Sequence, residues 1–78
     1  PTVTPQIFIQ IAAFSDQTKA QSLAQAANIM YQHPTTVSKT QAIYRTLIGP
    51  IKNRTLADAL ILDVKGSGYN EAFIYIRS

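Results

Sequence analysis

The chain has 78 residues, of which 46% are hydrophobic and 14% charged, which suits one small domain with a surface of largely Gln, Asn, Ser and Thr. The absence of cysteine excludes disulfides and thiolate chemistry, and the single histidine, His33, has no second histidine with which to build a transition-metal site. The net charge of +3 favours an anionic partner, but lysine and arginine are scattered singly, which argues against nucleic-acid binding.

The first residues predict a linker end followed by a strand. Residues 1–6 are polar and contain two prolines, and we expect the domain itself to span 7–78. Isoleucines at 7, 9 and 11 alternate with other side chains, the period-two pattern of a strand with one buried face. No run approaches the ~20 apolar residues of a membrane span, and no signal peptide is present. The chain opens abruptly at Pro1, so we expect a piece of a longer protein, and we expect no membrane insertion by this segment.

A helix is expected next. Ser15 or Asp16 can accept a hydrogen bond from its first free N–H groups and act as N-cap. Apolar residues then recur at helical spacing up to Tyr31, and many are alanines, which implies close approach of the helix to the surface beneath it. Pro34 cannot continue a helix and closes this one around Gln32–His33.

The middle of the chain predicts two strands joined by a tight connection. Residues 35–39 are short, polar and β-branched, and 40–41 make the connection. A second strong strand follows at 42–48, and Gly49-Pro50 is expected to end it with a turn.

The last third predicts a second helix and a closing strand. Asn53 is a good N-cap, and apolar residues recur behind it at helical spacing. Lys65 lies in the last turn, where a cation complements the free carbonyl groups, and Gly66 or Gly68 can take the left-handed conformation that terminates the helix. Residues 72–76 form the final strand.

A weak internal repeat connects the two halves. A shift of 37 residues aligns Ile11 with Ile48, Asp16 with Asn53, Ala20 with Ala57, and Leu23 with Leu60. Two copies of a strand-cap-helix unit in the order βαββαβ predict an α+β, ferredoxin-like split βαβ fold, with a four-stranded sheet and two helices on one face. The first and third strands then lie in the middle of the sheet.

The second face of this sheet is the candidate binding surface. If the isoleucines at 7, 9 and 11 face the helices, the central strands present Phe8, Gln10, Ala12, Ile43, Arg45 and Leu47 outward. Apolar surface suits the C–H face of a sugar ring, and an amide or guanidinium hydrogen-bonds its hydroxyl and N-acetyl groups. Arg45 can also bind a carboxylate through two parallel hydrogen bonds.

Other interpretations stay open at this point. Such a face often serves a protein–protein contact, and from pattern alone we favour that over sugar binding. RNA-recognition motifs share the topology but place stacking aromatic residues on both central strands, and the third strand here offers none outward. The phase of the last strand is undecided, because Phe73 and Tyr75 are as apolar as Ile74 and Ile76.

An enzymatic function finds no support among the residues. Asp58 and Asp63 are five positions apart on a helix and so are not stacked. Ser67 has no plausible base, and His33 is most simply an exposed residue at a helix end. We therefore expect no catalytic residues and no cofactor.

Two motifs resemble the SPOR domain family. The sequence IQIAAF at 9–14, followed by Ala20 and Leu23, is similar to the opening pattern of a SPOR domain, close to V-Q-V-G-A-F. YRTLIGPI at 44–51, followed by Ala57 and Leu60, is similar to the second pattern, near Y-R-V-x-V-G-P-F. A Gly-Tyr pair at 68–69 and the closing apolar strand also fit, so the resemblance covers nearly the whole chain from Ile7 onward.

The resemblance implies a bacterial cell-envelope module that binds peptidoglycan, particularly glycan strands stripped of their stem peptides. In the family the domain is a localisation device, found in division proteins, amidases and lytic transglycosylases of the rare lipoprotein A type. It implies a periplasmic or envelope location, enriched at the division septum, with no cofactor or metal. It implies no nucleic-acid partner, and a monomeric domain of a longer protein.

The family's binding residues map onto the sheet face and its rim. By position, Gln10 matches the family glutamine of the first strand, Ala13 a neighbouring position, and Arg45 the arginine of the third strand. Two positions depart from the pattern, because Ala12 replaces the usual glycine and Ile43 stands where some members have tryptophan. Without that stacking platform, Phe8 or Tyr75 would have to compensate. The expected glycan-binding residues are Phe8, Gln10, Ala12, Ala13, Ile43, Arg45, Leu47 and Tyr75.

Overall fold

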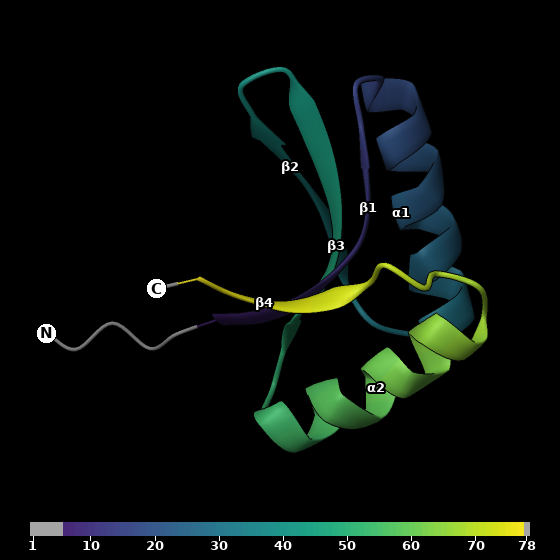
Figure 1. Ribbon diagram of the computed structural model, residues 1–78, viewed down its shortest axis with the longest axis vertical. Coiled ribbons are helices and arrows are strands. Elements are labelled where there is room, and N and C mark those ends of the chain that lie inside the picture. Colours follow the sequence, from purple (N-terminus) through teal and green to yellow (C-terminus); the bar gives the residue numbers. More distant parts are fainter. Residues whose placement is uncertain (1–5, 78) are drawn as a thin grey trace, which may run out of the picture.

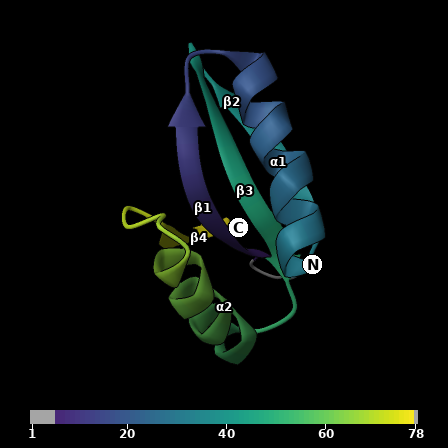
Figure 2. The same cartoon turned by 90° about the vertical axis from the view of Figure 1, so that its right-hand side faces the viewer.

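The two strand-helix-strand halves of the sequence share a single sheet in the computed structural model, which describes residues 6–77. The elements are β1 (Gln6–Phe14), α1 (Gln17–Tyr31), β2 (Thr35–Thr40), β3 (Ile43–Ile51), α2 (Arg54–Gly66) and β4 (Phe73–Arg77). The strands are antiparallel in the order β2-β3-β1-β4, so β1 and β3 occupy the centre. Both helices cover the same face (Figures 1 and 2). The α+β split βαβ prediction is confirmed.

Side-chain caps begin both helices, at Asp16, one of the two predicted candidates, and at Asn53 as predicted. The Asp16 carboxylate accepts a hydrogen bond from the Thr18 N–H at 2.8 Å, and the Asn53 carbonyl oxygen accepts one from the Leu56 N–H at 2.9 Å. These bonds satisfy N–H groups that have no partner inside the helix. Helix α1 ends where Gln32 takes the left-handed conformation, two residues before the proline.

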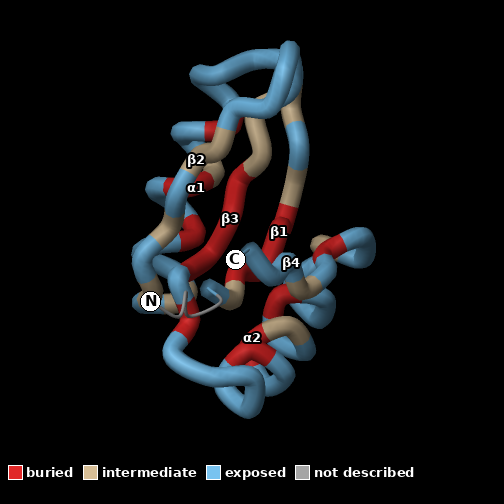
Figure 3. Tube along the Cα trace, turned by 90° about the vertical axis from the view of Figure 1, so that its left-hand side faces the viewer, coloured by how far each residue is buried: buried red, intermediate tan, exposed pale blue. Residues whose placement is uncertain are grey.

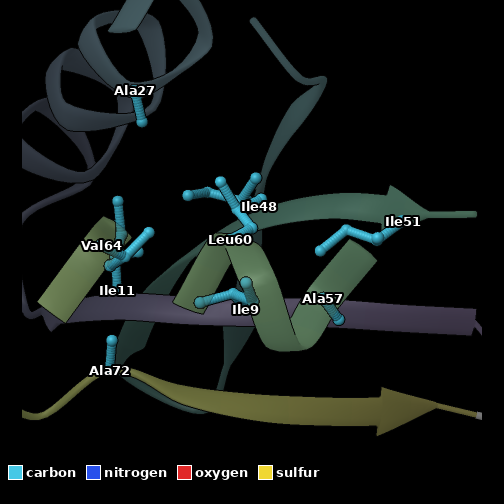
Figure 4. Close-up of a cluster of buried hydrophobic side chains, with 9 residues drawn as sticks. All are labelled: Ile9, Ile11, Ala27, Ile48, Ile51, Ala57, Leu60, Val64 and Ala72. Atoms are coloured by element: carbon cyan, nitrogen blue, oxygen red, sulfur yellow. The ribbon is translucent and has the colours of Figure 1, made fainter. Parts of the chain in front are cut away.

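The helices pack through small side chains, as the alanine-rich stripe predicts. Ala20 and Ala57, equivalent in the internal repeat, are both 0% exposed. The close approach of α1 lets the buried Thr46 hydroxyl donate to the Ala20 carbonyl at 3.1 Å, and the Thr35 hydroxyl donates to the Ala24 carbonyl. The hydrophobic core lies between the sheet and α2, with α1 contributing at one end (Figure 4): Ile9, Ile11, Ala27, Ile48, Ile51, Ala57, Leu60, Val64 and Ala72.

Both central strands contain an irregularity. Ile9 pairs with Ile48 and Ile7 with Ile51, so β3 has one extra residue between these pairs. This bulge contains Gly49 and the cis peptide bond to Pro50. The prediction that Gly49-Pro50 ends the strand is therefore wrong: the bulge accommodates the proline, which has no N–H to donate, and pairing resumes at Ile51.

The second irregularity lies in β1. Gln10 pairs with Leu47 and Ala12 with Thr46, so Ile11 is the extra residue on this strand. Ile11 is buried in the core. A bulge of this kind changes which side chains beyond it point to which face of the sheet.

Several element boundaries differ from the prediction by one or two residues. The hairpin turn is at 41–42 rather than 40–41, because Gln41 takes the left-handed conformation there. Helix α2 includes Gly66, and it is Gly68 that has a positive φ, of 108°. No helix among residues 6–77 is long and apolar enough to cross a membrane.

The two ends of the described chain are neighbours. Gln6 is the first residue of β1 and pairs with Arg77, the last residue of β4. The chain therefore enters and leaves the sheet at the same corner (Figure 1). The expected linker extends to residue 6, but the strand already begins there, and residues 1–5 lie outside the described part.

Candidate functional site

Strand pairing identifies the side chains on the face opposite the helices. Directly opposed residues of antiparallel strands point to the same side of a sheet. Phe8 pairs with Tyr75 and Gln10 with Phe73, so the last strand presents Phe73 and Tyr75 on this face and Ile74 toward the helices. The phase of β4 is thereby decided.

The open face is defined here by the side chains that pairing and strand alternation place on it. They are Thr36, Ser38 and Thr40 from β2, Ile43, Arg45 and Leu47 from β3, Gln6, Phe8, Gln10 and Ala13 from β1, and Phe73, Tyr75 and Arg77 from β4.

The bulge in β1 corrects one expected position. Ala12 was expected to face outward with Gln10, but it pairs with Thr46, whose hydroxyl bonds to α1. Ala12 therefore lies on the helix side. Ala13 pairs with Arg45 and is exposed, so it takes the place on the open face that simple alternation assigns to its neighbour.

The middle of the open face is a buried floor rather than an exposed surface. Phe8 and Leu47 are 1% exposed and Gln10 is 8% exposed, although no helix covers them. Figure 3 shows the buried stretches of β1 and β3 side by side, bordered by more exposed strands. Side chains of neighbouring strands lie against two of these three residues: Tyr75 and Arg77 contact the Phe8 ring, and Arg45 bonds to Gln10. The expectation that these three side chains are freely presented is therefore wrong.

The exposed groups lie around this floor. Ile43, Phe73 and Tyr75 are 42%, 45% and 36% exposed. The Tyr75 ring stands 6.3 Å from the Phe8 ring, centroid to centroid, at 43°. The face thus combines a packed apolar base with accessible aromatic and aliphatic side chains at the edges, where a flat ring can be held.

One hydrogen bond organises the polar centre of the face. The Arg45 guanidinium donates from Nη1 to the Gln10 side-chain oxygen at 3.2 Å, joining residues on adjacent central strands. The bond is partly buried and uses one of the five N–H groups of the guanidinium. Arg45 has no carboxylate partner, since the only ion pair within residues 6–77 joins Arg54 to Asp58 on α2.

Charge is segregated between the sheet and the rest of the domain. All side-chain carboxylates of the chain lie outside the strands, at Asp16, Asp58, Asp63 and Glu71. The strands carry Lys39, Arg45 and Arg77, of which the two arginines are on the open face. This face therefore offers positive charge without a negative group of its own, an arrangement that attracts anions.

Six residues of the face were not among the expected binding residues, and they include an aromatic ring and a cation: Gln6, Thr36, Ser38, Thr40, Phe73 and Arg77. Phe73, Tyr75 and Arg77 are two residues apart along β4 and therefore point to the same face of the sheet. The alternation that brings Tyr75 to the open face thus also brings the arginine. Asp58 and Asp63 lie on α2 and not on the open face. Asp58 is paired with Arg54, and within residues 6–77 no three of His, Cys, Asp and Glu gather as metal ligands would.

Comparison with known proteins agrees with both sequence motifs. The model of the SPOR domain family matches residues 5–75. The chain belongs to the SPOR domain family. Among solved structures, this SPOR domain is similar to the peptidoglycan binding domain of the cell wall lytic enzyme CwlC from B. subtilis, determined in solution, with 26% identity and a TM-score of 0.80. The match covers 100% of this chain and 96% of the CwlC domain. No curated relative matches the sequence.

Proposed function

We propose that this domain binds peptidoglycan through the open face, without catalysis, and that its preferred ligand is a glycan strand stripped of stem peptides. Membership of the SPOR family and the full-length similarity to the CwlC peptidoglycan binding domain support peptidoglycan as the ligand class. The observation that carries the choice of face is Arg45, held by Gln10 at the centre of a sheet that contains no acidic residue.

The chemistry of the denuded strand matches this face. Removal of the peptide leaves a free lactyl carboxylate on each muramic residue, so the ligand is a polyanion with sugar faces. A guanidinium binds a carboxylate through two parallel bonds, and the exposed rims of Phe73 and Tyr75 can lie against the C–H face of a sugar ring. Intact stem peptides would replace these carboxylates by neutral amides.

The proposed cellular role follows from where such strands occur. Denuded glycan accumulates where amidases split the wall, which is the division septum. A non-catalytic domain with this preference would direct a larger envelope protein, in the periplasm or on the cell wall, to that place. The open face has no carboxylate or histidine that could act as acid or base, so we infer binding alone.

A pull-down experiment tests the ligand and the face together. The domain is mixed with purified sacculi, before and after treatment with an amidase, and the fraction that sediments is measured. Wild type should sediment more strongly after treatment. Arg45→Ala should weaken binding by roughly 10- to 100-fold, the equivalent of one charged hydrogen-bond pair.

The matched control removes the same charge elsewhere. Arg54 is an exposed arginine on α2, paired with Asp58 and away from the open face. Arg54→Ala should bind like wild type, and thermal unfolding of both variants checks that they remain folded. Equal loss in the two variants would mean that only net charge matters, and unchanged binding by Arg45→Ala would reject this face.

A protein–protein or oligomerisation module is the second candidate. The exposed apolar side chains Ile43, Phe73 and Tyr75 on one face support it. Sedimentation velocity over a range of concentrations distinguishes the two. A concentration-dependent dimer that is lost in Phe73→Ser would favour association, whereas a monomer at all concentrations would favour glycan binding.

A further inference from the structure

Arg77 is held in a defined position at one end of the open face, where it pairs with Gln6. Its guanidinium carbon lies 4.8 Å from the centre of the Phe8 ring, a cation–π contact. Its Nη2 donates to the Gln6 side-chain oxygen at 3.3 Å. Two contacts from different residues therefore orient a side chain that is itself exposed.

The contacts with Phe8 and Gln6 leave most of the N–H groups of the Arg77 guanidinium available. A guanidinium that lies against a ring uses its flat face for the contact, while its N–H groups point outward in the plane. Only one of five N–H groups is used by Gln6. Within residues 6–77, Arg77 has no carboxylate partner, so its charge is not neutralised by the described part of the domain.

The two guanidinium groups lie above the same strand. Arg45 reaches Gln10, and Arg77 reaches Phe8, two positions earlier on β1. Side chains two apart on one strand face are ~7 Å from each other, and adding the offsets toward β3 and β4 places the charges roughly 10–15 Å apart. Both guanidinium groups thus contact side chains of the buried floor, Arg45 at Gln10 and Arg77 at Phe8, and Tyr75 packs beside Phe8. The two cations are therefore presented on the same face of the sheet.

We propose that Arg77 forms a second carboxylate-binding subsite, so that the open face engages two acidic groups of one polymer at the same time. The inference rests on the proposed function, because it takes a repeating acidic glycan as the ligand. It adds a length requirement: a fragment with one free carboxylate uses only one arginine, whereas a strand with two or more uses both. Because both carboxylates belong to one glycan strand, binding of the second carboxylate to the second arginine is intramolecular. This raises the affinity of longer strands.

Calorimetric titration with denuded glycan fragments of increasing length tests the subsite. The informative variant is Arg77→Met, because methionine keeps an apolar cover over Phe8 while removing the charge. Wild type should gain roughly tenfold in affinity when a second muramic carboxylate is present, the scale of one charged hydrogen bond. Arg77→Met should lose this gain and bind a fragment with one carboxylate like wild type. Arg77→Lys should recover part of the gain.

Two controls separate recognition from a structural effect. Arg54→Met removes the same charge from α2 and should show the wild-type dependence on length. Glycan whose carboxylates have been reduced to alcohols should bind equally to wild type and Arg77→Met. If Arg77→Met weakens all fragments equally, or weakens the reduced polymer too, the subsite is refuted. If wild type binds no denuded glycan at all, the proposed function itself fails.

Discussion

Replacing Gly49 with alanine should destabilise the domain more than any other single methyl addition at a glycine. Gly49 lies in the β3 bulge with φ of +142°, a conformation that residues with a side chain rarely adopt. A Cβ there would stand 2.8 Å from the Ile7 carbonyl oxygen and 2.8 Å from Cδ1 of Phe8. The first contact is with the backbone of a central strand, and the second is with a ring that is 1% exposed, so neither neighbour can easily move.

The size of the effect follows from two separate costs. The strained backbone conformation accounts for about 1–3 kcal/mol, and forcing an extra methyl group into a packed site for about 1–3 kcal/mol. A domain of 78 residues has a free energy of unfolding of about 4–12 kcal/mol in total. The two costs together come to about 2–6 kcal/mol, so Gly49→Ala should remove at least about a sixth of the stability, and at 3 kcal/mol lower the Tm by roughly 12–24 °C.

The other two glycines serve as internal controls in the same thermal and urea denaturation assay. Gly66, at the end of α2, has nothing within 4 Å of an added Cβ, so Gly66→Ala should be neutral or stabilise by about 0.5 kcal/mol. Gly68 has φ of +108° and the same open space, so Gly68→Ala should cost only the backbone strain, about 1–2 kcal/mol. A Gly49→Ala protein within about 1 kcal/mol of wild type, or no worse than Gly68→Ala, would refute this reasoning.

Two further predictions concern hydrogen bonds to the helices, both measured by urea denaturation. Thr46→Val keeps the side-chain volume but removes the buried hydrogen bond to the Ala20 carbonyl, and should lower the free energy of unfolding by about 1 kcal/mol. Thr35→Val removes the less buried bond to the Ala24 carbonyl and should cost less. A larger loss for Thr35→Val than for Thr46→Val would contradict the role of burial. Asn53→Ala removes the cap on the Leu56 N–H and should also cost about 1 kcal/mol, whereas Asn53→Asp, which keeps an acceptor, should restore most of it.

The starts of both helices could be predicted because they depend on local chemistry, and the topology because the element order restricts it. Asp16 and Asn53 cap helices through side chains that act within three residues, and both are at the predicted positions. The repeat that aligns Ala20 with Ala57 identifies two equivalent helices packed by small residues, and a short-linked βαββαβ order leaves few arrangements of the sheet.

The details of the open face could not be predicted, because they depend on pairing between distant strands. The bulge at Ile11 is invisible in a stretch where Ile11, Ala12 and Ala13 are all apolar, yet it exchanges the facing of the two alanines. The phase of β4 is equally hidden, since both of its faces are apolar, and only pairing of Tyr75 with Phe8 decides it.

Burial within that face is a separate property. Alternation correctly places Phe8 and Leu47 on the face away from the helices, but it carries no information on how deeply they are buried or on which side chains of β4 contact Phe8. Arg77 was missed for the same reason: its contact with the Phe8 ring joins residues at the two ends of the chain. The roles of the expected binding residues stay predictions until the titrations are made.

Adjacent ends of the first and last strands also have a mechanical consequence. Gln6 and Arg77 face each other across an antiparallel pair, whose hydrogen bonds run perpendicular to the strands. A force that pulled the two ends apart would open this pair one bond at a time, like a zipper, at low load. A force between the Gln6 end of β1 and a ligand held by Arg45 on β3 would instead run along the strands and load many bonds of the β1–β3 ladder together. The domain should therefore resist mechanical unfolding best when it is tethered through β1 and bound to its ligand through β3.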